Sequence, residues 1–95
     1  MDKKLRVGVV GVGHLGKFHA EKYHKIKDCF LHSVSDTSPE RGNSVAEAYN
    51  CIYHADYKSM VGMVDAVSVA VPTTLHFKIT DFFLSHGIHV LVEKP

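Results

Sequence analysis

The sequence predicts an α/β fold in which a doubly wound parallel sheet of about five strands has helices on both faces. Short apolar runs alternate with amphipathic stretches along all 95 residues, with short connections between them. This pattern is typical of parallel strands joined by right-handed crossovers. In addition, the run at 66–71 is almost continuously apolar, as expected for a parallel strand that is covered on both faces.

The first strand is predicted at 5–10 and leads directly into a glycine-rich turn at 11–16. A helix from about 14 to 27 overlaps this turn, because apolar side chains recur there at helical spacing. We expect these side chains near the face that packs on the sheet: Leu15, Phe18, His19, Tyr23 and Ile26. A series at i,i+4 spacing on another face favours side-chain ion pairs: Lys17, Glu21 and Lys25.

The second strand is predicted at 30–35 and is followed by a second helix. Ser38 is a good N-cap for a helix whose first residue is Pro39, where a missing N–H costs nothing. The helix runs to about Tyr49, and we expect its inward side chains to be Val45, Ala46 and Tyr49. Asn50 is then expected to end the helix in a left-handed conformation.

The middle of the chain predicts two strands separated by a short helix. The stretch 51–54 is long enough only for a weak third strand, and Asp56 is a suitable N-cap for one to two helical turns. We expect three side chains of this segment to pack inward: Met60, Val61 and Met63. A methionine pair at this spacing is more typical of a core than of a binding surface. The fourth strand, 66–71, ends at Pro72.

A third long helix is predicted after Pro72, with Thr73 or Thr74 as its cap and Gly87 at its end. Its apolar stripe is expected to face the sheet: Leu75, Ile79, Phe82 and Phe83. The fifth strand follows at 88–92 and leads into 93–95.

The glycines at 11–16 have the spacing G-x-G-x-x-G, and each has a separate role. Gly11 allows a sharp turn out of the strand, Gly13 has no Cβ to obstruct a pyrophosphate, and Gly16 lets the helix pack closely. The helix begins at this loop, so its free N–H groups and the positive end of its dipole face the same position. The loop therefore predicts an anion site for a dinucleotide.

Asp36 stands where a dinucleotide site needs a carboxylate, about 20 residues after the loop and at the end of the second strand. There it would accept hydrogen bonds from the adenosine ribose hydroxyls. The alternative is a turn or helix-cap aspartate. An ionised Asp36 repels a 2′-phosphate, so we predict NAD rather than NADP, although Arg41 nearby can accommodate that phosphate.

Composition excludes several classes of function. A net charge of +1 gives one small domain no general attraction to nucleic acid or anionic membrane. No signal peptide or membrane span is evident, so we expect a cytoplasmic protein. Cys29 and Cys51 are too few for a disulfide framework and lack a base for nucleophilic catalysis. The eight histidines offer no third ligand for a metal, and none is expected.

In an open parallel sheet, ligands bind beyond the carboxyl ends of the strands. Special residues stand at several of these ends and carry a resemblance to the Gfo/Idh/MocA family of glucose-fructose oxidoreductases and inositol dehydrogenases. The motifs are GVGHLG at 11–16, VPTTLH at 71–76 and EKP at 93–95. The chain is similar to the N-terminal, NAD(P)-binding Rossmann domain of that family, which more often has asparagine where Thr73 stands.

The resemblance implies a set of cofactor-binding residues: Gly11, Val12, Gly13, His14, Leu15, Gly16, Asp36, Val71, Pro72, Thr73, His76, Glu93 and Lys94. Within this set, the glycines would hold the pyrophosphate and Asp36 the adenosine ribose. Glu93 and Lys94 would reach the nicotinamide ribose and the reacting centre. Lys94 is the implied catalytic residue, because a fixed ammonium stabilises a developing alkoxide or relays a proton.

The function implied by the resemblance is that of an NAD(P)-dependent oxidoreductase acting on a secondary alcohol of a sugar or nucleotide sugar. Within the family, the sequence of these motifs is most similar to that of nucleotide-sugar 3-dehydrogenases that act on UDP-N-acetylglucosamine. Residues 1–95 would form a partial dinucleotide-binding domain, truncated before the sixth strand and the C-terminal domain, that binds cofactor without turnover. The full-length protein is expected to be a homo-oligomer. The alternative is a non-catalytic NAD-binding or assembly module, which would not need Glu93 and Lys94.

Overall fold

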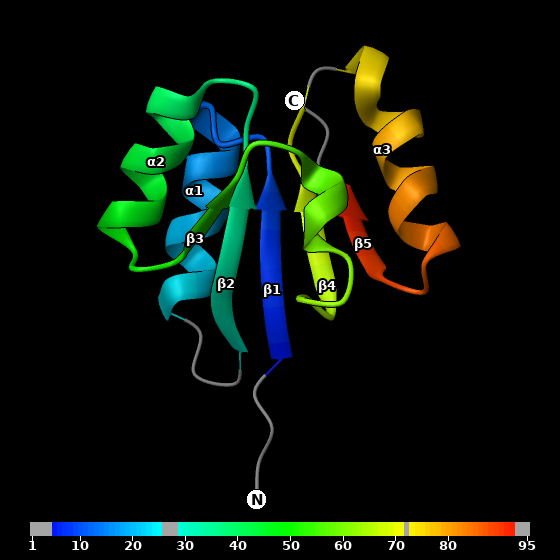
Figure 1. Cartoon of the computed structure of the whole chain (residues 1–95), viewed down its shortest axis with the longest axis horizontal. Coiled ribbons are helices and arrows are strands. Elements are labelled where there is room, and N and C mark those ends of the chain that lie inside the picture. The colour runs from blue at the N-terminus through cyan, green and yellow to red at the C-terminus, as the bar shows by residue number, and fades with distance from the viewer. Residues whose placement is uncertain (1–4, 26–28, 72, 93–95) are drawn as a thin grey trace, which may run out of the picture.

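The computed structural model describes residues 5–25, 29–71 and 73–92. Strands and helices alternate along them as the sequence predicts (Figure 1). In chain order the elements are β1 (Leu5–Val10), α1 (His14–Lys25), β2 (Cys29–Ser35), α2 (Pro39–Ala48), β3 (Ile52–His54), the 3₁₀ helix η1 (Tyr57–Met60), β4 (Ala66–Val69), α3 (Thr73–Ser85) and β5 (His89–Val92).

The described strands form one parallel sheet in the order β3-β2-β1-β4-β5. The chain moves outward from β1 to β3, returns past β1 to β4 and then moves outward again. The strand order therefore reverses beside β1, and a crevice forms there at the carboxyl edge of the sheet. The predicted doubly wound α/β class is confirmed.

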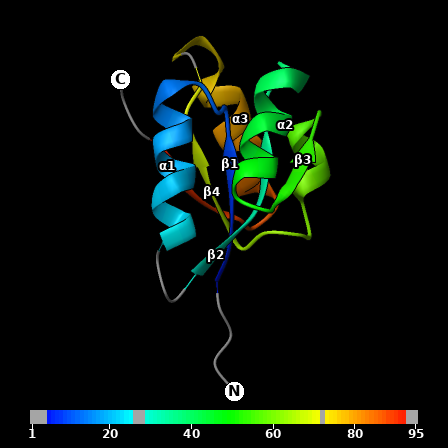
Figure 2. The same cartoon turned by 90° about the vertical axis from the view of Figure 1, so that its left-hand side faces the viewer.

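The two faces of the sheet carry separate cores. Val9 packs with side chains of α1 and α2, whereas Val10, the next residue of β1, packs with side chains of η1 and α3. Alternate strand residues point to opposite faces, so these helices cover both sides of the sheet. In Figure 2, α1 and α2 lie toward the viewer and α3 lies behind the strands. Tyr23 Oη of α1 also lies 2.6 Å from the Ser68 hydroxyl on β4.

The predicted helix ends are confirmed by the capping hydrogen bonds and the left-handed backbone angles found there. Ser38 Oγ accepts a hydrogen bond of 3.3 Å from the backbone N–H of Arg41, and Asp56 Oδ1 accepts one of 2.9 Å from the second residue of η1. Asn50 has a φ of 53° and Gly87 a φ of 73°, both left-handed. One predicted ion pair of α1 also forms, at 3.1 Å between Lys25 Nζ and Glu21 Oε1. Local rules therefore determine where these helices begin and end.

Two side chains predicted to pack inward do not do so. Met60 is fully buried, but Met63 is 41% exposed because Gly62, with a φ of 86°, turns the chain between them. Leu75 is also 41% exposed. It lies one turn nearer the start of α3 than the buried Ile79, where it lines a hollow at the carboxyl edge of the sheet.

Two element ends beside the carboxyl edge also differ from the prediction. β4 ends at Val69, two residues before the predicted end. α3 begins at Thr73, so Thr73 and Thr74 belong to its first turn and neither is its cap. Pro72 lies outside the described residues, as does Ile26 of the predicted first helix.

Candidate functional site

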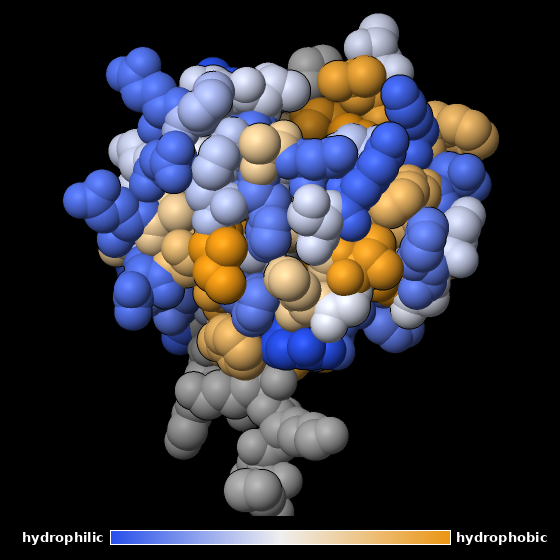
Figure 3. Space-filling view, viewed as in Figure 1, coloured by the Kyte–Doolittle hydropathy of each residue, from blue (hydrophilic) through white to orange (hydrophobic). Residues whose placement is uncertain are grey.

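A hollow of about 370 Å³ lies at the carboxyl edge of the sheet, where β1, β2 and β4 end. Its lining joins the glycine loop to side chains that follow other strands, among them Gly11, Gly13, Asp36, Arg41, Tyr57 and Val71. At this end of the molecule, apolar side chains gather at the upper right of Figure 3, near the start of α3. The ends of β1, β2 and β4 therefore converge as predicted, whereas residues 93–95, predicted to join them after β5, lie outside the described residues.

Each loop glycine has surroundings that match its predicted role. Gly11 has a φ of 89°, and a Cβ there would lie 2.6 Å from the carbonyl oxygen of Ala70. A Cβ on Gly16 would collide with the Gly11 carbonyl, so α1 packs closely on the loop only because Gly16 has none. A Cβ on Gly13 would meet nothing within 4 Å. The loop is thus tight where it packs and open where a ligand would approach.

The carboxylate of Asp36 is held by four donors. Oδ2 accepts from the backbone N–H of Val12 at 2.8 Å and from Arg41 Nε at 3.2 Å. Oδ1 accepts from the backbone N–H of Ser38 at 2.8 Å and from Arg41 Nη2 at 2.8 Å. Asp36 therefore ties the glycine loop to the start of α2.

These bonds keep Asp36 ionised. Burial by itself would raise the pKa of Asp36, but hydrogen bonds from Arg41, Ser38 and Val12, together with the positive charge of Arg41, lower it below its ordinary value. A carboxylate that accepts several hydrogen bonds and faces a guanidinium favours its charged form. The site thus keeps an anionic acceptor next to an open glycine loop.

The rest of the hollow is mainly apolar. It is lined by Tyr57 of η1, by Val71 of the segment that follows β4, and by Leu75 and Ile79 of α3. Lys78 of α3 also lines it. Sequence reasoning missed Tyr57 and Lys78 as site residues. The sequence gives one indication that Lys78 lies near the sheet: it directly precedes Ile79, which belongs to the apolar stripe of α3.

A second hollow of about 450 Å³ adjoins the first, since Gly13 and Arg41 line both. Val12 lines the second hollow, and its side chain is buried. Its backbone N–H donates the hydrogen bond that Asp36 accepts. An extended ligand could therefore cross the loop at Gly13 and lie in both hollows.

Among the remaining predicted site residues, His76 is the one whose side chain the structure describes away from the hollow. His76 lines a separate hollow on the outer side of α3, together with Phe77 and Leu84. His14 and Leu15 lie in the first turn of α1 and Thr73 in that of α3, but their side chains are outside what the structure describes. Pro72, Glu93 and Lys94 also lie outside the described residues.

Other chemistries receive no support from the described parts of the chain. Within residues 5–25, 29–71 and 73–92, no three histidine, cysteine or acidic side chains come together in a way that could hold a metal ion. Burial raises the pKa of the Cys51 thiol to about 11, so the thiol is protonated at neutral pH and is a poor nucleophile. Across the same ranges, no helix combines the length and apolar character that crossing a bilayer requires.

A doubly wound parallel sheet with an open glycine loop and an acidic residue after β2 defines a dinucleotide-binding protein of the Rossmann type. Comparison with protein families assigns the chain further. Residues 5–95 match the model of the Gfo/Idh/MocA oxidoreductase family, described as having an NAD-binding Rossmann fold. The chain belongs to this family.

Its relatives include dehydrogenases of known substrate. The chain is 42% identical over 91 residues to the UDP-N-acetylglucosamine 3-dehydrogenase of Acidithiobacillus ferrooxidans, covering 96% of this chain and 28% of that protein. The structure of that enzyme superimposes with a TM-score of 0.90, covering 98% of this chain and 30% of that one. The chain thus spans less than a third of the length of this relative.

Two inositol dehydrogenases are also similar. The scyllo-inositol dehydrogenase of Lactobacillus casei, solved with NAD(H) and scyllo-inositol, is 30% identical and has a TM-score of 0.89, covering 98% of this chain and 28% of that one. An NADP(+)-dependent scyllo-inositol 2-dehydrogenase of Bacillus subtilis is 32% identical over 94 residues, covering 96% of this chain and 29% of that protein. Both forms of the cofactor therefore occur among the relatives.

Proposed function

We propose that this chain is the dinucleotide-binding domain of an NAD-dependent oxidoreductase that acts on a secondary alcohol of a sugar or nucleotide sugar. The observation that carries the proposal is the glycine loop, which is open at Gly13 and hydrogen-bonded through Val12 to the buried carboxylate of Asp36. The family match and the substrates of the relatives support the same class of reaction.

The residues at the hollow fit a dinucleotide. The pyrophosphate would lie over Gly13, where no side chain intervenes and the N-terminus of α1 favours an anion. Asp36 would accept the adenosine ribose hydroxyls. The apolar side chains of Tyr57, Leu75 and Ile79 would line the adenine position. Each role uses a chemical group that is suited to that part of the cofactor.

NAD is the cofactor that we propose as preferred. Asp36 is ionised, and its negative charge favours ribose hydroxyls over a 2′-phosphate. The pairing of Asp36 with Arg41 at 2.8 Å offsets part of this charge, so we expect a preference and not complete exclusion of NADP.

The reacting end would lie beyond β5. A bound nicotinamide cofactor supplies hydride transfer at its C4. By resemblance, Glu93 and Lys94 would lie near the nicotinamide ribose. The Lys94 ammonium would stabilise negative charge on the substrate oxygen as the alcohol loses its proton. The identity of 42% to a UDP-N-acetylglucosamine 3-dehydrogenase supports a nucleotide sugar as the substrate.

We also propose that the 95 residues bind cofactor without turning over substrate. The dehydrogenase relative is more than three times as long as the matched segment, since the match covers 28% of it. Formation of NADH by the purified chain in the presence of a sugar or nucleotide sugar would contradict this proposal.

The test is calorimetric titration of the folded chain with NAD and with NADP, together with an Asp36→Ala variant. We expect NAD to bind more tightly than NADP and the variant to lose that difference. Circular dichroism of both proteins would show that the comparison concerns folded chains. Absence of binding of either cofactor to the folded chain would contradict the proposal for these residues.

A further inference from the structure

The two side edges of the described sheet differ in the surface that their outermost elements expose. β3 and α2 form one side edge, and β5 and α3 form the other (Figure 1). The exposed residues of α2 are mostly polar, among them Glu40, Asn43 and Glu47. On α3, by contrast, Phe77 is 82% exposed and Leu84 is 58% exposed. Large apolar side chains therefore face the solvent at the β5 side of the sheet.

β5 is an edge strand without the usual protection against pairing. It pairs with β4 on one side, and no strand of the described residues lies on its other side. Its sequence, HVLV, contains no lysine, acidic residue or proline, which commonly block edge-to-edge association. Leu91 is 52% exposed and points away from α3, because its neighbour Val90 packs with the core under that helix. The outer backbone groups of β5 can therefore pair with another strand.

The outer flank of α3 continues this apolar edge. On the inner flank, the ring of Phe82 contacts that of Tyr57 in η1, with 5.4 Å between their centroids. The flank that points away from η1 has a hollow of about 340 Å³, lined by His76, Phe77, Thr80, Asp81 and Leu84. Asp81 is the only carboxylate in this lining, to which no lysine or arginine belongs. Few charges and large apolar side chains are typical of the centre of a protein interface.

The geometry of this edge suits pairing with a second copy of itself. α3 joins β4 to β5 and contacts both, so it lies over the interval between them. When two β5 strands pair antiparallel, the two-fold axis is perpendicular to the sheet and both α3 helices lie on the same face. Their axes are then about two strand spacings, or about 10 Å, apart, which is the distance at which helices pack. The outer flanks of the two helices thus meet, and the two Leu91 side chains lie together on the other face.

We propose that two copies of the 95-residue chain associate through β5 and the outer flank of α3 into a two-fold dimer with one continuous sheet. Each copy contributes the same surface, so the interface is closed and self-complementary. The candidate cofactor hollow is lined by Leu75, Lys78 and Ile79 from the start of α3 and by Tyr57 on the inner flank, so the dimer leaves it open. An interface of one strand and one helix from each copy is small, so we expect it to dissociate at roughly micromolar concentrations.

The experiment is sedimentation equilibrium of the 95-residue chain at concentrations from about 1 to about 500 μM. We expect the mass to rise with concentration from 10.6 kDa to twice that value and no further. Leu91→Lys places two ammonium groups near each other, and Leu84→Glu brings two carboxylates into an apolar contact. Each variant should raise the dissociation constant of the dimer at least about tenfold. A mass that stays at 10.6 kDa over the whole range would overturn the proposal and leave this surface to a partner outside these residues.

Ile52→Lys is the matched control, because Ile52 lies on β3 at the other side edge and is 49% exposed, close to the 52% of Leu91. Its dissociation constant should equal that of the unaltered chain. Equal weakening by Ile52→Lys and Leu91→Lys would contradict an interface confined to the β5 side. Growth beyond two copies would show that both side edges pair and would contradict the closed dimer. Circular dichroism checks the fold of each variant, and the mass of the unaltered chain tests the dimer even if a variant does not fold.

Discussion

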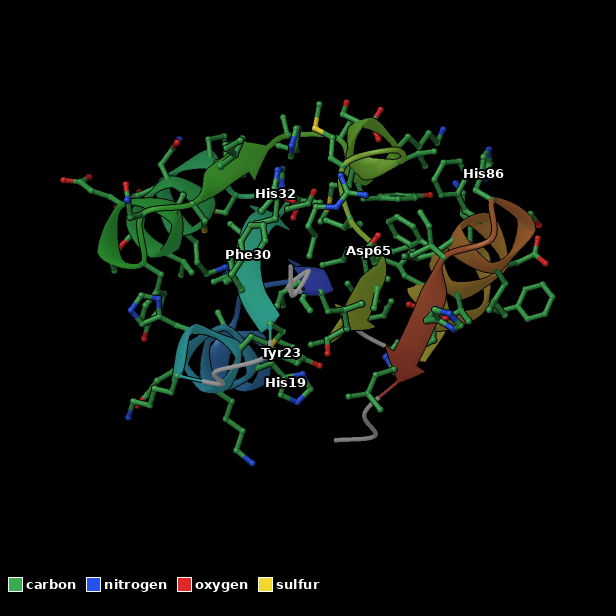
Figure 4. The ribbon with its side chains drawn as sticks, turned by 90° about the horizontal axis from the view of Figure 1, so that it is seen from below. His19, Tyr23, Phe30, His32, Asp65 and His86 are labelled. Carbon is green, nitrogen blue, oxygen red and sulfur yellow. The ribbon has the colours of Figure 1, made fainter. Side chains whose placement is uncertain are left out.

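At each edge of the sheet, an arginine side chain donates two hydrogen bonds to an aspartate carboxylate. At the carboxyl edge, Arg41 Nη2 lies 2.8 Å from Asp36 Oδ1, and at the amino edge Arg6 Nη2 lies 3.1 Å from Asp65 Oδ1. Each carboxylate also accepts a backbone N–H, which for Asp65 is that of Arg6 at 2.8 Å. Figure 4, which looks at the amino edge, shows Asp65 beside β4.

The two pairs differ in what surrounds them. The side chain of Asp36 is 3% exposed and lies under Arg41 beside an open glycine loop, whereas that of Asp65 is 39% exposed. Water can replace a lost partner at Asp65 but not at the N–H of Val12, which is buried with Asp36. An arginine–aspartate pair therefore becomes part of a candidate binding site only where burial and an adjacent open loop accompany it.

The largest expected effect concerns the glycines at the two edges. Gly16→Ala places a Cβ against the Gly11 carbonyl, and we expect it to lower the free energy of unfolding by about 3 kcal/mol or more. Gly62, whose carbonyl oxygen accepts from Arg6, has a φ of 86° but open space around a Cβ. Gly62→Ala should cost about 1 to 2 kcal/mol. Urea-induced unfolding measures both, and equal losses would contradict the difference in packing.

The second-largest expected effect is the difference in stability lost when Asp36 and Asp65 are each replaced by alanine. Asp36→Ala leaves the buried N–H of Val12 without its acceptor, so we expect a loss of about 2 to 3 kcal/mol in the free energy of unfolding. Asp65→Ala disrupts a half-exposed pair and should cost at most about 1 kcal/mol. The same unfolding experiment tests this order. A larger loss for Asp65→Ala would show that the amino edge is the more tightly coupled one.

The smallest effect is the dependence of stability on pH. The pKa of Asp36 is lower in the folded chain than its ordinary value of 3.8, so its stabilisation is present above about pH 4 and is lost as the pH falls through the folded pKa. Unfolding free energies at about pH 6 and about pH 3 should therefore differ more for the unaltered chain than for Asp36→Asn. Equal pH dependence in the two proteins would contradict the lowered pKa.

The sequence by itself determined the elements and the loop. Their signals are local: alternating apolar periodicity, the caps at Ser38 and Asp56, the left-handed residues Asn50 and Gly87, and the G-x-G-x-x-G spacing. Strand ends of a parallel sheet necessarily share one edge, so the meeting of the loop with Asp36 could also be predicted.

Only the tertiary structure decided which side chains meet at that edge and which remain exposed. Arg41 was recognised in the sequence as a neighbour of Asp36, but not as the donor that saturates it. Tyr57 and Lys78 line the hollow from η1 and α3. Leu75, which periodicity places on the inward face of α3, lines the hollow too and stays 41% exposed. Periodicity fixes the face of a helix on which a residue lies. How far that face extends past the sheet depends on where distant strands end, which no local pattern records.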